Sequence, residues 1–207
     1  MRLRERLQGK RLLLTGVTGF VGEALLHRIL RDLPETTVVA LVRRKGSLSA
    51  RARMEQLLGK PIFESIRSDF GGEAAALLDA RWEVIEGDLT DVPALPGDLD
   101  VVIHCAGDVS FDPPIDQAFK TNVLGTEQLL NRILHSGGRT AEAHYVHVST
   151  AYVSGRRRGA IPEGPVDHQA DWRTEAKWGL EMRERVEATS RTPAVLAKLS
   201  KQAERDH

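Results

Sequence analysis

Three glycines follow one another at every third residue between an apolar segment and an amphipathic segment near the start of the chain. The apolar segment, residues 10–16, has the length of a buried strand, and residues 20–31 have helical spacing. Gly16, Gly19 and Gly22 therefore lie in a strand-to-helix turn. Such a turn lets the backbone approach a pyrophosphate closely, and the amides at the start of the helix can bind it. The pattern favours dinucleotide binding over a merely structural turn.

The glycine-rich motif T-G-V-T-G-F-V-G defines the residues that we expect at the cofactor. The predicted set is Thr15, Gly16, Thr18, Gly19, Phe20, Val21 and Gly22. In the helix that follows, we expect Val21, Leu25 and Ile29 to share the buried face, because they recur at intervals of four residues.

Predicted strands and helices alternate through the rest of the first 150 residues. Further strands are expected at 36–42, 82–88, 100–107 and 144–150, and helices at 48–58 and 118–136. The helix at 118–136 is expected to pack through Val123, Thr126, Leu130, Ile133 and Leu134. Because the strands are apolar along their length, Val146 and Val148 included, the pattern indicates a parallel sheet covered on both faces. We predict an α/β, doubly wound Rossmann-type fold.

The composition changes near Gly155, where charged helical sequence replaces the strand–helix alternation. We expect an NADP-binding Rossmann domain over residues 1–160 and a charged helical extension or insertion over 161–207. Five strands are predicted where this fold usually has more. The fold is therefore expected to be truncated at the C-terminal side and to lack a substrate domain. We expect the chain to be the N-terminal piece of a longer protein.

Charge and cysteine content exclude several classes of protein. Basic and acidic residues number 29 each, so no global charge favours nucleic acid. The single cysteine, Cys105, cannot form an internal disulfide, and no Cys/His cluster has metal-ligand spacing, so no metal is predicted. The charged N-terminus is unlike a signal peptide, and no apolar run reaches the roughly 20 residues that span a bilayer. We expect a cytoplasmic protein; peripheral membrane contact and oligomeric state stay open.

A basic run follows the second predicted strand, where the adenosine ribose is expected to bind. Arg43, Arg44 and Lys45 occupy this place, and Arg51 and Arg53 follow. An acidic residue there would favour NAD, whereas a guanidinium can bind a 2′-phosphate with two hydrogen bonds. We predict NADPH/NADP, with Arg43, Arg44 and Arg53 at the cofactor; the alternative is a solvated basic loop.

Together these motifs resemble a known family. The spacing TGxTGFxG is similar to that of extended short-chain dehydrogenases/reductases. The segments TGVTGFVGEALLHRIL, LVRRKGSLSARARMEQLL, HCAGDVSFDPPIDQAFKTNVLGT and VHVSTAYVSG resemble the reductase domain of fatty acyl-CoA reductases. Carboxylic acid reductases and the thioester reductase domains of peptide synthetases share the pattern more loosely. The resemblance covers residues 8–155 well, and 167–207 looks like an insertion of bacterial members.

The resemblance implies further cofactor contacts after the third and fourth strands. Asp88, next to Leu89, would bind the adenine amino group, or Asp88 would cap a turn. Cys105, Ala106 and Gly107 would lie beside the nicotinamide ribose, while the side chains of Cys105 and His104 are expected only to pack.

The resemblance also implies catalytic residues. Thr150, with its neighbour Ser149 as the alternative, would hydrogen-bond the substrate carbonyl and polarise it towards hydride. Asn122 would bend its helix and hold a water molecule, or be an ordinary polar residue of that helix. Tyr152 is expected to pack or to line the pocket.

One expected element is missing from the sequence. Related reductases use a Tyr-xxx-Lys pair, in which the lysine lowers the tyrosine pKa for proton transfer. The residue four positions after Tyr145 is Ser149, and four positions after Tyr152 is Arg156. We therefore expect this chain alone to bind cofactor but to turn over poorly or not at all.

The activity implied by the resemblance is NADPH-dependent reduction of a long-chain fatty acyl-CoA thioester to an aldehyde or an alcohol. Three alternatives stay open. They are a thioester reductase acting on a carrier protein, a nucleotide-sugar epimerase or dehydratase, and a non-catalytic NADP-binding protein.

Overall fold

The structure is a computed structural model that describes residues 3–69, 71–155, 157–164 and 169–205. The chain divides into two compact units. The first combines Met1–Gly107 with Gly125–Pro162, and the second combines Asp108–Leu124 with Glu163–His207.

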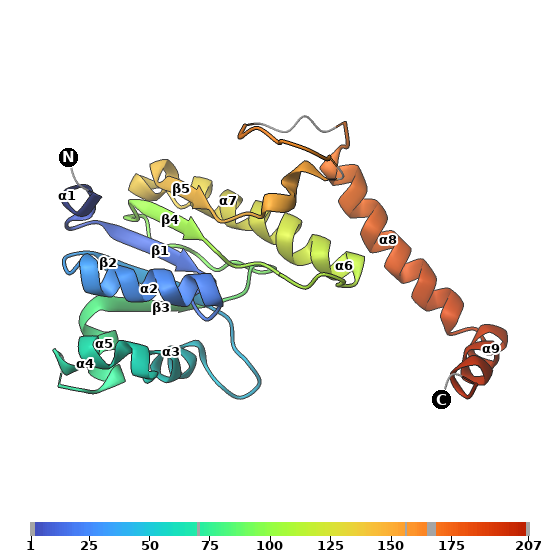
Figure 1. Cartoon of the computed structure of the whole chain (residues 1–207), viewed down its shortest axis with the longest axis horizontal. Coiled ribbons are helices and arrows are strands. Elements are labelled where there is room, and N and C mark those ends of the chain that lie inside the picture. Colours follow the sequence, from blue (N-terminus) through green and yellow to red (C-terminus); the bar gives the residue numbers. More distant parts are fainter. Residues whose placement is uncertain (1–2, 70, 156, 165–168, 206–207) are drawn as a thin grey trace. The chain divides into compact units, whose positions relative to one another are not determined.

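The first unit is built on a five-stranded sheet in which every neighbouring pair of strands is parallel (Figure 1). The strand order is β3-β2-β1-β4-β5. The strands are β1 (Arg11–Thr15), β2 (Thr37–Val42), β3 (Trp82–Glu86), β4 (Val101–His104) and β5 (His144–His147). Because β2 and β4 flank β1, the chain crosses to the other side of β1 after β3. In open α/β sheets, ligands bind at the carboxyl ends of the strands beside such a switch point.

Helices and single turns connect these strands. In this unit they are α1 (Leu3–Leu7), α2 (Phe20–Asp32), α3 (Ala50–Leu58), η1 (Pro61–Phe63), α4 (Glu64–Ser68), α5 (Ala74–Arg81), α7 (Gly125–His135), η3 (Gly138–Glu142) and η4 (Ala151–Ser154). Ser49 starts α3 by accepting a hydrogen bond from the Ala52 amide at 3.2 Å.

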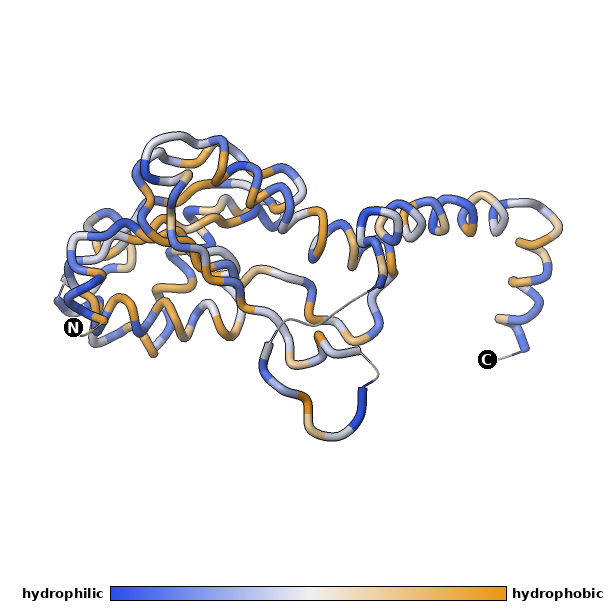
Figure 2. Tube along the Cα trace, turned by 90° about the horizontal axis from the view of Figure 1, so that it is seen from above, coloured by the Kyte–Doolittle hydropathy of each residue, from blue (hydrophilic) through white to orange (hydrophobic). Residues whose placement is uncertain are grey.

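Alternate residues of β1 face two separate hydrophobic clusters. Leu12 and Leu14 pack with Leu26 of α2, whereas Leu13 packs with Leu129 of α7. Figure 1 shows α2 and α7 on opposite sides of the sheet, and Figure 2 shows hydrophobic stretches of the chain alternating with hydrophilic ones. Each fully buried leucine contributes roughly 2 kcal/mol. The predicted doubly wound α/β fold is confirmed.

The outer strands are covered less than expected. Val146 of β5 is 38% exposed, and Val148, just beyond the strand, is 39% exposed. The prediction that these valines are buried is wrong for the part of the chain that the structure describes. Here β5 pairs on one side only, with β4, so it forms an edge of the sheet.

The buried face of α2 agrees with the prediction at Ile29 but not at Val21 or Leu25, which is only half-buried. Gly22, Leu26, Ile29 and Leu30 are buried, whereas Val21 is 45% exposed. A Cβ added at Gly22 would collide with the carbonyl group of Gly16. The helix therefore turns its bare glycine towards the β1–α2 turn, and this close approach sets the face that packs.

The predicted helix at 118–136 is not continuous. It consists of α6 (Ile115–Ala118), the π-helical segment η2 (Phe119–Leu124) and α7. A π-helical turn holds more residues than an α-helical turn and therefore shifts the positions that follow it. In α7, Leu129 and Ile133 are buried, but Leu134, predicted to pack, is 62% exposed.

The second unit contains α6, η2, α8 (Trp172–Ser190) and α9 (Pro193–Ala203). The Asp171 side chain caps α8 by accepting from the Arg173 and Thr174 amides, each at 3.3 Å. Gly179 lies against the Phe119 ring, which an added Cβ would approach to 2.7 Å. No helix among the described residues is long and apolar enough to cross a membrane.

Candidate functional site

The glycine turn between β1 and α2 is sterically restricted at two positions. Gly16 has a φ of +71°, which favours glycine, and a Cβ there would lie 2.6 Å from Ala106 N. Gly22 has no room for a Cβ beside Gly16, as described above. Both glycines are therefore needed to bring the turn against its neighbours.

Gly19 is less restricted than the other two glycines. A Cβ there would meet only Gly16 O within 4 Å, at 3.3 Å, a tight contact that a small shift could relieve. Gly19 is also the N-cap of α2, and no side chain caps the helix. The first turn of a helix carries amides that its own backbone cannot satisfy, so this end of a 13-residue helix suits an anion. The exposed backbone at Gly19 and the helix end without a side-chain cap fit a dinucleotide pyrophosphate.

The remaining predicted residues of this turn lie at its surface. Thr18 is exposed, Phe20 is 93% exposed and Val21 is 45% exposed. Thr18 Oγ1 accepts a hydrogen bond from Arg53 Nη2 at 3.1 Å. Arg53 Nη1 donates to the Arg43 carbonyl at 2.5 Å. The Arg53 guanidinium thus connects the glycine turn to the basic loop after β2.

Acidic groups lie near the other two predicted arginines. Arg44 Nη1 is 3.1 Å from Glu86 Oε1, and Arg43 Nη1 is 3.8 Å from Asp88 Oδ2. The hydrogen bond from the Ala50 amide has the largest effect on Glu86 and lowers the pKa of its carboxyl group. Arg44 lowers this pKa further. Arg43 is the more exposed arginine, with 70% of its side chain accessible against 58% for Arg44. Arg43 is therefore the less engaged cation at the end of β2.

The residues after β3 take different positions. Asp88 Oδ1 accepts from the Thr90 amide at 3.0 Å and from its hydroxyl at 2.9 Å, as in a side-chain-capped turn. Leu89 is only 7% exposed and packs in the cluster that contains Leu41 and Leu95. Its side chain belongs to the core, so any cofactor contact of Leu89 would involve its backbone.

Thr15 joins the glycine turn to the segment after β4. Its hydroxyl oxygen accepts from the Cys105 and Ala106 amides, both at 3.2 Å, and lies 2.7 Å from His104 Nδ1. Cys105 and Ala106 are partly buried, and Gly107 is exposed. Burial raises the pKa of the Cys105 thiol. Sequence reasoning missed the hydrogen-bonding role of His104; the signal was a histidine and a threonine that end neighbouring strands.

The hydroxyl-rich stretch after β5 is exposed at both predicted catalytic residues. Thr150 is the N-cap of η4, and its Oγ1 accepts from the Tyr152 amide at 3.2 Å. A hydroxyl that accepts in this way still has its own hydrogen to donate. Ser149 precedes the cap, and Tyr152 is 77% exposed rather than packed. Burial raises the pKa of Tyr145 to about 12, opposite to the shift that a catalytic tyrosine needs.

Asn122 lies in the second unit, within the π-helical segment η2. Its Oδ1 accepts from the Asp108 amide at 2.7 Å, and its Nδ2 donates to the Asp108 carbonyl at 2.9 Å. π-Helical segments are frequent at functional sites. Here the asparagine side chain holds the backbone that follows Gly107.

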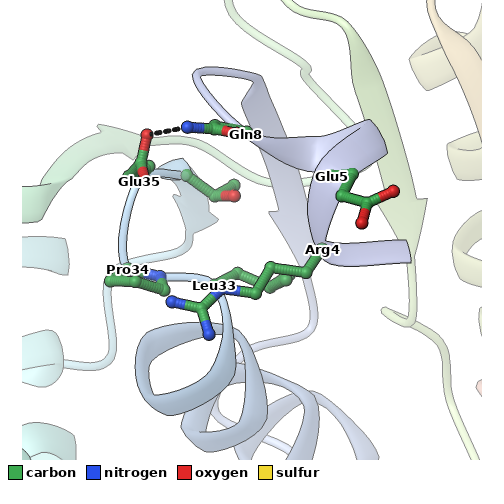
Figure 3. A pocket seen from close by; sticks show the side chains of 7 residues that line it. Arg4, Glu5, Gln8, Leu33, Pro34 and Glu35 are labelled. Carbon is green, nitrogen blue, oxygen red and sulfur yellow. Dashed lines mark hydrogen bonds between the residues drawn. The ribbon is translucent and has the colours of Figure 1, made fainter. Parts of the chain in front are cut away.

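A separate cavity lies at the opposite end of the sheet. It measures about 130 Å³ and is lined by residues of α1 and of the α2–β2 connection, with Gln8 donating to Glu35 at 2.7 Å (Figure 3). Its lining is Arg4, Glu5, Gln8, Leu33, Pro34, Glu35 and Thr36. The connection leads into the amino end of β2, so this cavity is not part of the candidate site.

Comparison with known families agrees with this geometry. A family model described as "Male sterility protein" matches residues 14–194. The chain belongs to this family. The match spans the glycine turn, the basic loop and the hydroxyl-rich stretch, so all the candidate residues above lie inside it.

Curated relatives bear out the resemblance to fatty acyl-CoA reductases. Over 159 residues, the chain is 34% identical to fatty acyl-CoA reductase 1 of Xenopus laevis. This alignment covers 74% of the chain but 30% of the relative, so the chain spans about a third of the relative's length.

Solved structures share the fold. A thiolation-reductase di-domain from an archaeal non-ribosomal peptide synthetase is 26% identical, with a TM-score of 0.51 over 72% of this chain and 37% of that one. A UDP-glucuronic acid 4-epimerase from Bacillus cereus, solved in complex with UDP-glucuronic acid and NAD, has a TM-score of 0.52 over 83% of this chain and 50% of that one. Its 22% identity supports the fold alone. This member of the male sterility protein family thus contains an NAD(P)-binding domain of the reductase type.

Proposed function

We propose that this chain is the NADPH-binding part of an enzyme that reduces a long-chain fatty acyl-CoA thioester to an aldehyde or an alcohol. The observation that carries the proposal is a glycine turn connected through Arg53 to exposed arginines after β2. This arrangement occurs in a chain that is 34% identical to a fatty acyl-CoA reductase over 74% of the chain's own length.

Selection of NADPH over NADH rests on Arg43, Arg44 and Arg53 in this proposal. Arg43 is the least engaged of the three and is best able to bind a 2′-phosphate. Asp88 and Glu86 would partly oppose the phosphate, which the arginines must offset by direct hydrogen bonds. Asp88 is proposed to contact adenine from its capped turn, and the 105–107 segment to border the nicotinamide ribose.

The reduction to an aldehyde would add hydride to the thioester carbonyl carbon, break the C–S bond and release coenzyme A, whose sulfur takes up a proton. Bound NADPH supplies the hydride. The Thr150 hydroxyl, oriented by the Tyr152 amide, would donate to the thioester carbonyl oxygen and stabilise the charge that develops there; Ser149 is the alternative donor. Asn122 would support the reaction by fixing the backbone at Asp108. Neither tyrosine of the chain is followed by lysine at the fourth position, so the 207-residue polypeptide is expected to bind cofactor without efficient turnover.

The arginine assignment is tested by comparing Arg43→Ala with Arg51→Ala. Arg51 is the control, because it pairs with Glu55 and Asp79 at 3.0 and 2.8 Å and has no predicted cofactor contact. Loss of a charge-assisted contact to phosphate should weaken NADPH binding by about tenfold or more. NADH binding should hardly change. If Arg43→Ala weakens both nucleotides equally, the 2′-phosphate assignment is wrong.

The likeness to the archaeal reductase di-domain favours one second candidate, a thioester reductase that acts on a carrier-bound acyl group. Turnover assays of the longer enzyme to which we assign this chain, with acyl-CoA and with acyl-carrier protein and monitored by NADPH consumption, distinguish the two. Faster turnover of the coenzyme A thioester supports the first proposal. Reduction of the carrier-bound thioester alone would replace it with the second.

A further inference from the structure

A hydrogen-bonded chain, buried at Thr15 and His104 and half-buried at Thr126, connects three elements of the first unit. His104, at the end of β4, has no exposed surface. Its Nδ1 lies 2.7 Å from the Thr15 hydroxyl of β1, and its Nε2 lies 3.2 Å from the Thr126 hydroxyl of α7. A buried imidazole with both nitrogens in contact has its tautomer set by these neighbours.

The hydrogen count at Thr15 fixes that tautomer. Its oxygen already receives two amide hydrogens, from Cys105 and Ala106. A hydroxyl accepts two hydrogen bonds and donates one, so the Thr15 hydrogen must point to His104 Nδ1. Nδ1 therefore carries no hydrogen. In the neutral ring the hydrogen lies on Nε2, which donates to Thr126.

We propose that His104, held as the Nε2–H tautomer, is a positioning residue for the dinucleotide site. It turns the Thr15 hydroxyl so that both lone pairs face the Cys105 and Ala106 amides. This fixes the 105–107 segment against the glycine turn. The assignment of this segment to the nicotinamide half of the cofactor rests on the proposed function, whereas the tautomer does not.

The contact between the two backbones shows why this orientation matters. A Cβ at Gly16 would lie within 2.7 Å of backbone atoms of both Cys105 and Ala106. Any displacement of the 105–107 segment towards the turn would therefore move Gly16. The Thr15 hydroxyl holds this separation, and His104 holds the hydroxyl.

A second proton on His104 would break the arrangement. It would place a third donor against Thr15 Oγ1 and leave the hydroxyl hydrogen without its acceptor. The rings of His147 and Tyr145 on β5 lie near His104 at centroid distances of 5.2 and 6.3 Å, while β1 and α7 each contribute an uncharged threonine hydroxyl. Burial, with a smaller effect from His147, lowers the pKa of His104 to about 4, which agrees with exclusion of that proton.

The tautomer can be measured directly, without cofactor, by long-range ¹H–¹⁵N NMR correlations of the uniformly labelled protein. The His104 signals are assigned by their loss in His104→Asn. The expected pattern at neutral pH is an unprotonated Nδ1 and a protonated Nε2. An Nδ1–H tautomer or an imidazolium would overturn the inference.

The positioning role is tested with His104→Leu, which removes the acceptor, and His104→Asn, whose amide oxygen can replace Nδ1. We expect His104→Leu to weaken NADPH binding by about tenfold, the effect of one lost hydrogen bond in a buried network. Binding of 2′,5′-ADP, which lacks the nicotinamide half, should stay unchanged, and His104→Asn should recover most of the loss.

Denaturant unfolding of each variant separates positioning from general destabilisation. Equal weakening of NADPH and 2′,5′-ADP, or no weakening of either in a folded His104→Leu protein, would overturn the positioning role. If the wild-type protein binds neither ligand, the proposed function fails, and the NMR result alone decides the tautomer.

Discussion

Individual glycines in the β1–α2 turn have different roles. Gly16 and Gly22 let two backbone segments approach each other, whereas a Cβ at Gly19, at the start of α2, would meet only Gly16 O, at 3.3 Å. One motif therefore contains two glycines that the packing requires and a third for which we propose a role at the ligand. The distinction cannot be read from the spacing of the glycines, because all three look alike in the sequence.

Substitution at Gly19 and at Gly22 should separate these roles. Gly19→Val places a branched side chain over the helix amides and should abolish binding of NADPH and NADH, with a stability loss of only about 1 kcal/mol. Gly22→Ala forces α2 away from Gly16 and should lower the free energy of unfolding by several times as much. Nucleotide titration combined with urea unfolding measures both effects. Unchanged nucleotide binding by Gly19→Val would contradict the phosphate-binding role of the turn.

At the scale of elements, the strands and their order were predictable, but the faces of two helices were not. Uniformly apolar segments predicted the five strands and the parallel sheet. The face of α2 depends on the close approach at Gly22, and the face of α7 follows a π-helical segment, neither of which a regular helical period reveals. The exposure of β5 depends on whether another element covers this edge strand. The periodicity of the sequence does not predict that.

Some features of the candidate site were likewise predictable from the sequence, and others were not. The glycine turn and the basic loop were predictable because their chemistry depends on residue type and on position after a strand. A turn cap at Asp88 was one of the two alternatives that the sequence left open, whereas the burial of Leu89 and the Arg53 bridge depend on side-chain directions that only the folded chain sets.

The π-helical segment η2 should depend on the two hydrogen bonds between Asn122 and Asp108. Asn122→Leu removes both, so the Asp108 amide should exchange with solvent at least about tenfold faster. Asn131→Leu, at an exposed position of α7, is the control and should leave that amide unaffected. Hydrogen exchange followed by NMR gives both rates. Equal exchange in wild type and Asn122→Leu would show that the side chain does not hold this backbone.

For the whole molecule, stability should fall in mild acid because His104 is buried without its second proton. Its folded pKa of about 4 lies below the ordinary value of 6.5, so the unfolded chain binds the proton more readily between these values. This contribution is complete above pH 6.5 and is lost as the pH falls towards 4. The shift corresponds to roughly 3 kcal/mol at most.

The acid effect is isolated by urea unfolding of wild type and His104→Asn at about pH 7 and about pH 5. The wild-type protein should lose more stability between these conditions than the variant does. Parallel losses in the two proteins would mean that His104 does not titrate differently on folding.

We propose that the glycine turn and the arginines after β2 form one NADPH-binding site. The most direct test of this proposal is titration of the purified 207-residue polypeptide with NADPH and with NADH under identical salt, with circular dichroism as the check of folding. We predict that NADPH binds at least about tenfold more tightly than NADH, a difference of roughly 1.4 kcal/mol. A folded polypeptide that binds neither nucleotide, or binds both equally, would contradict the account.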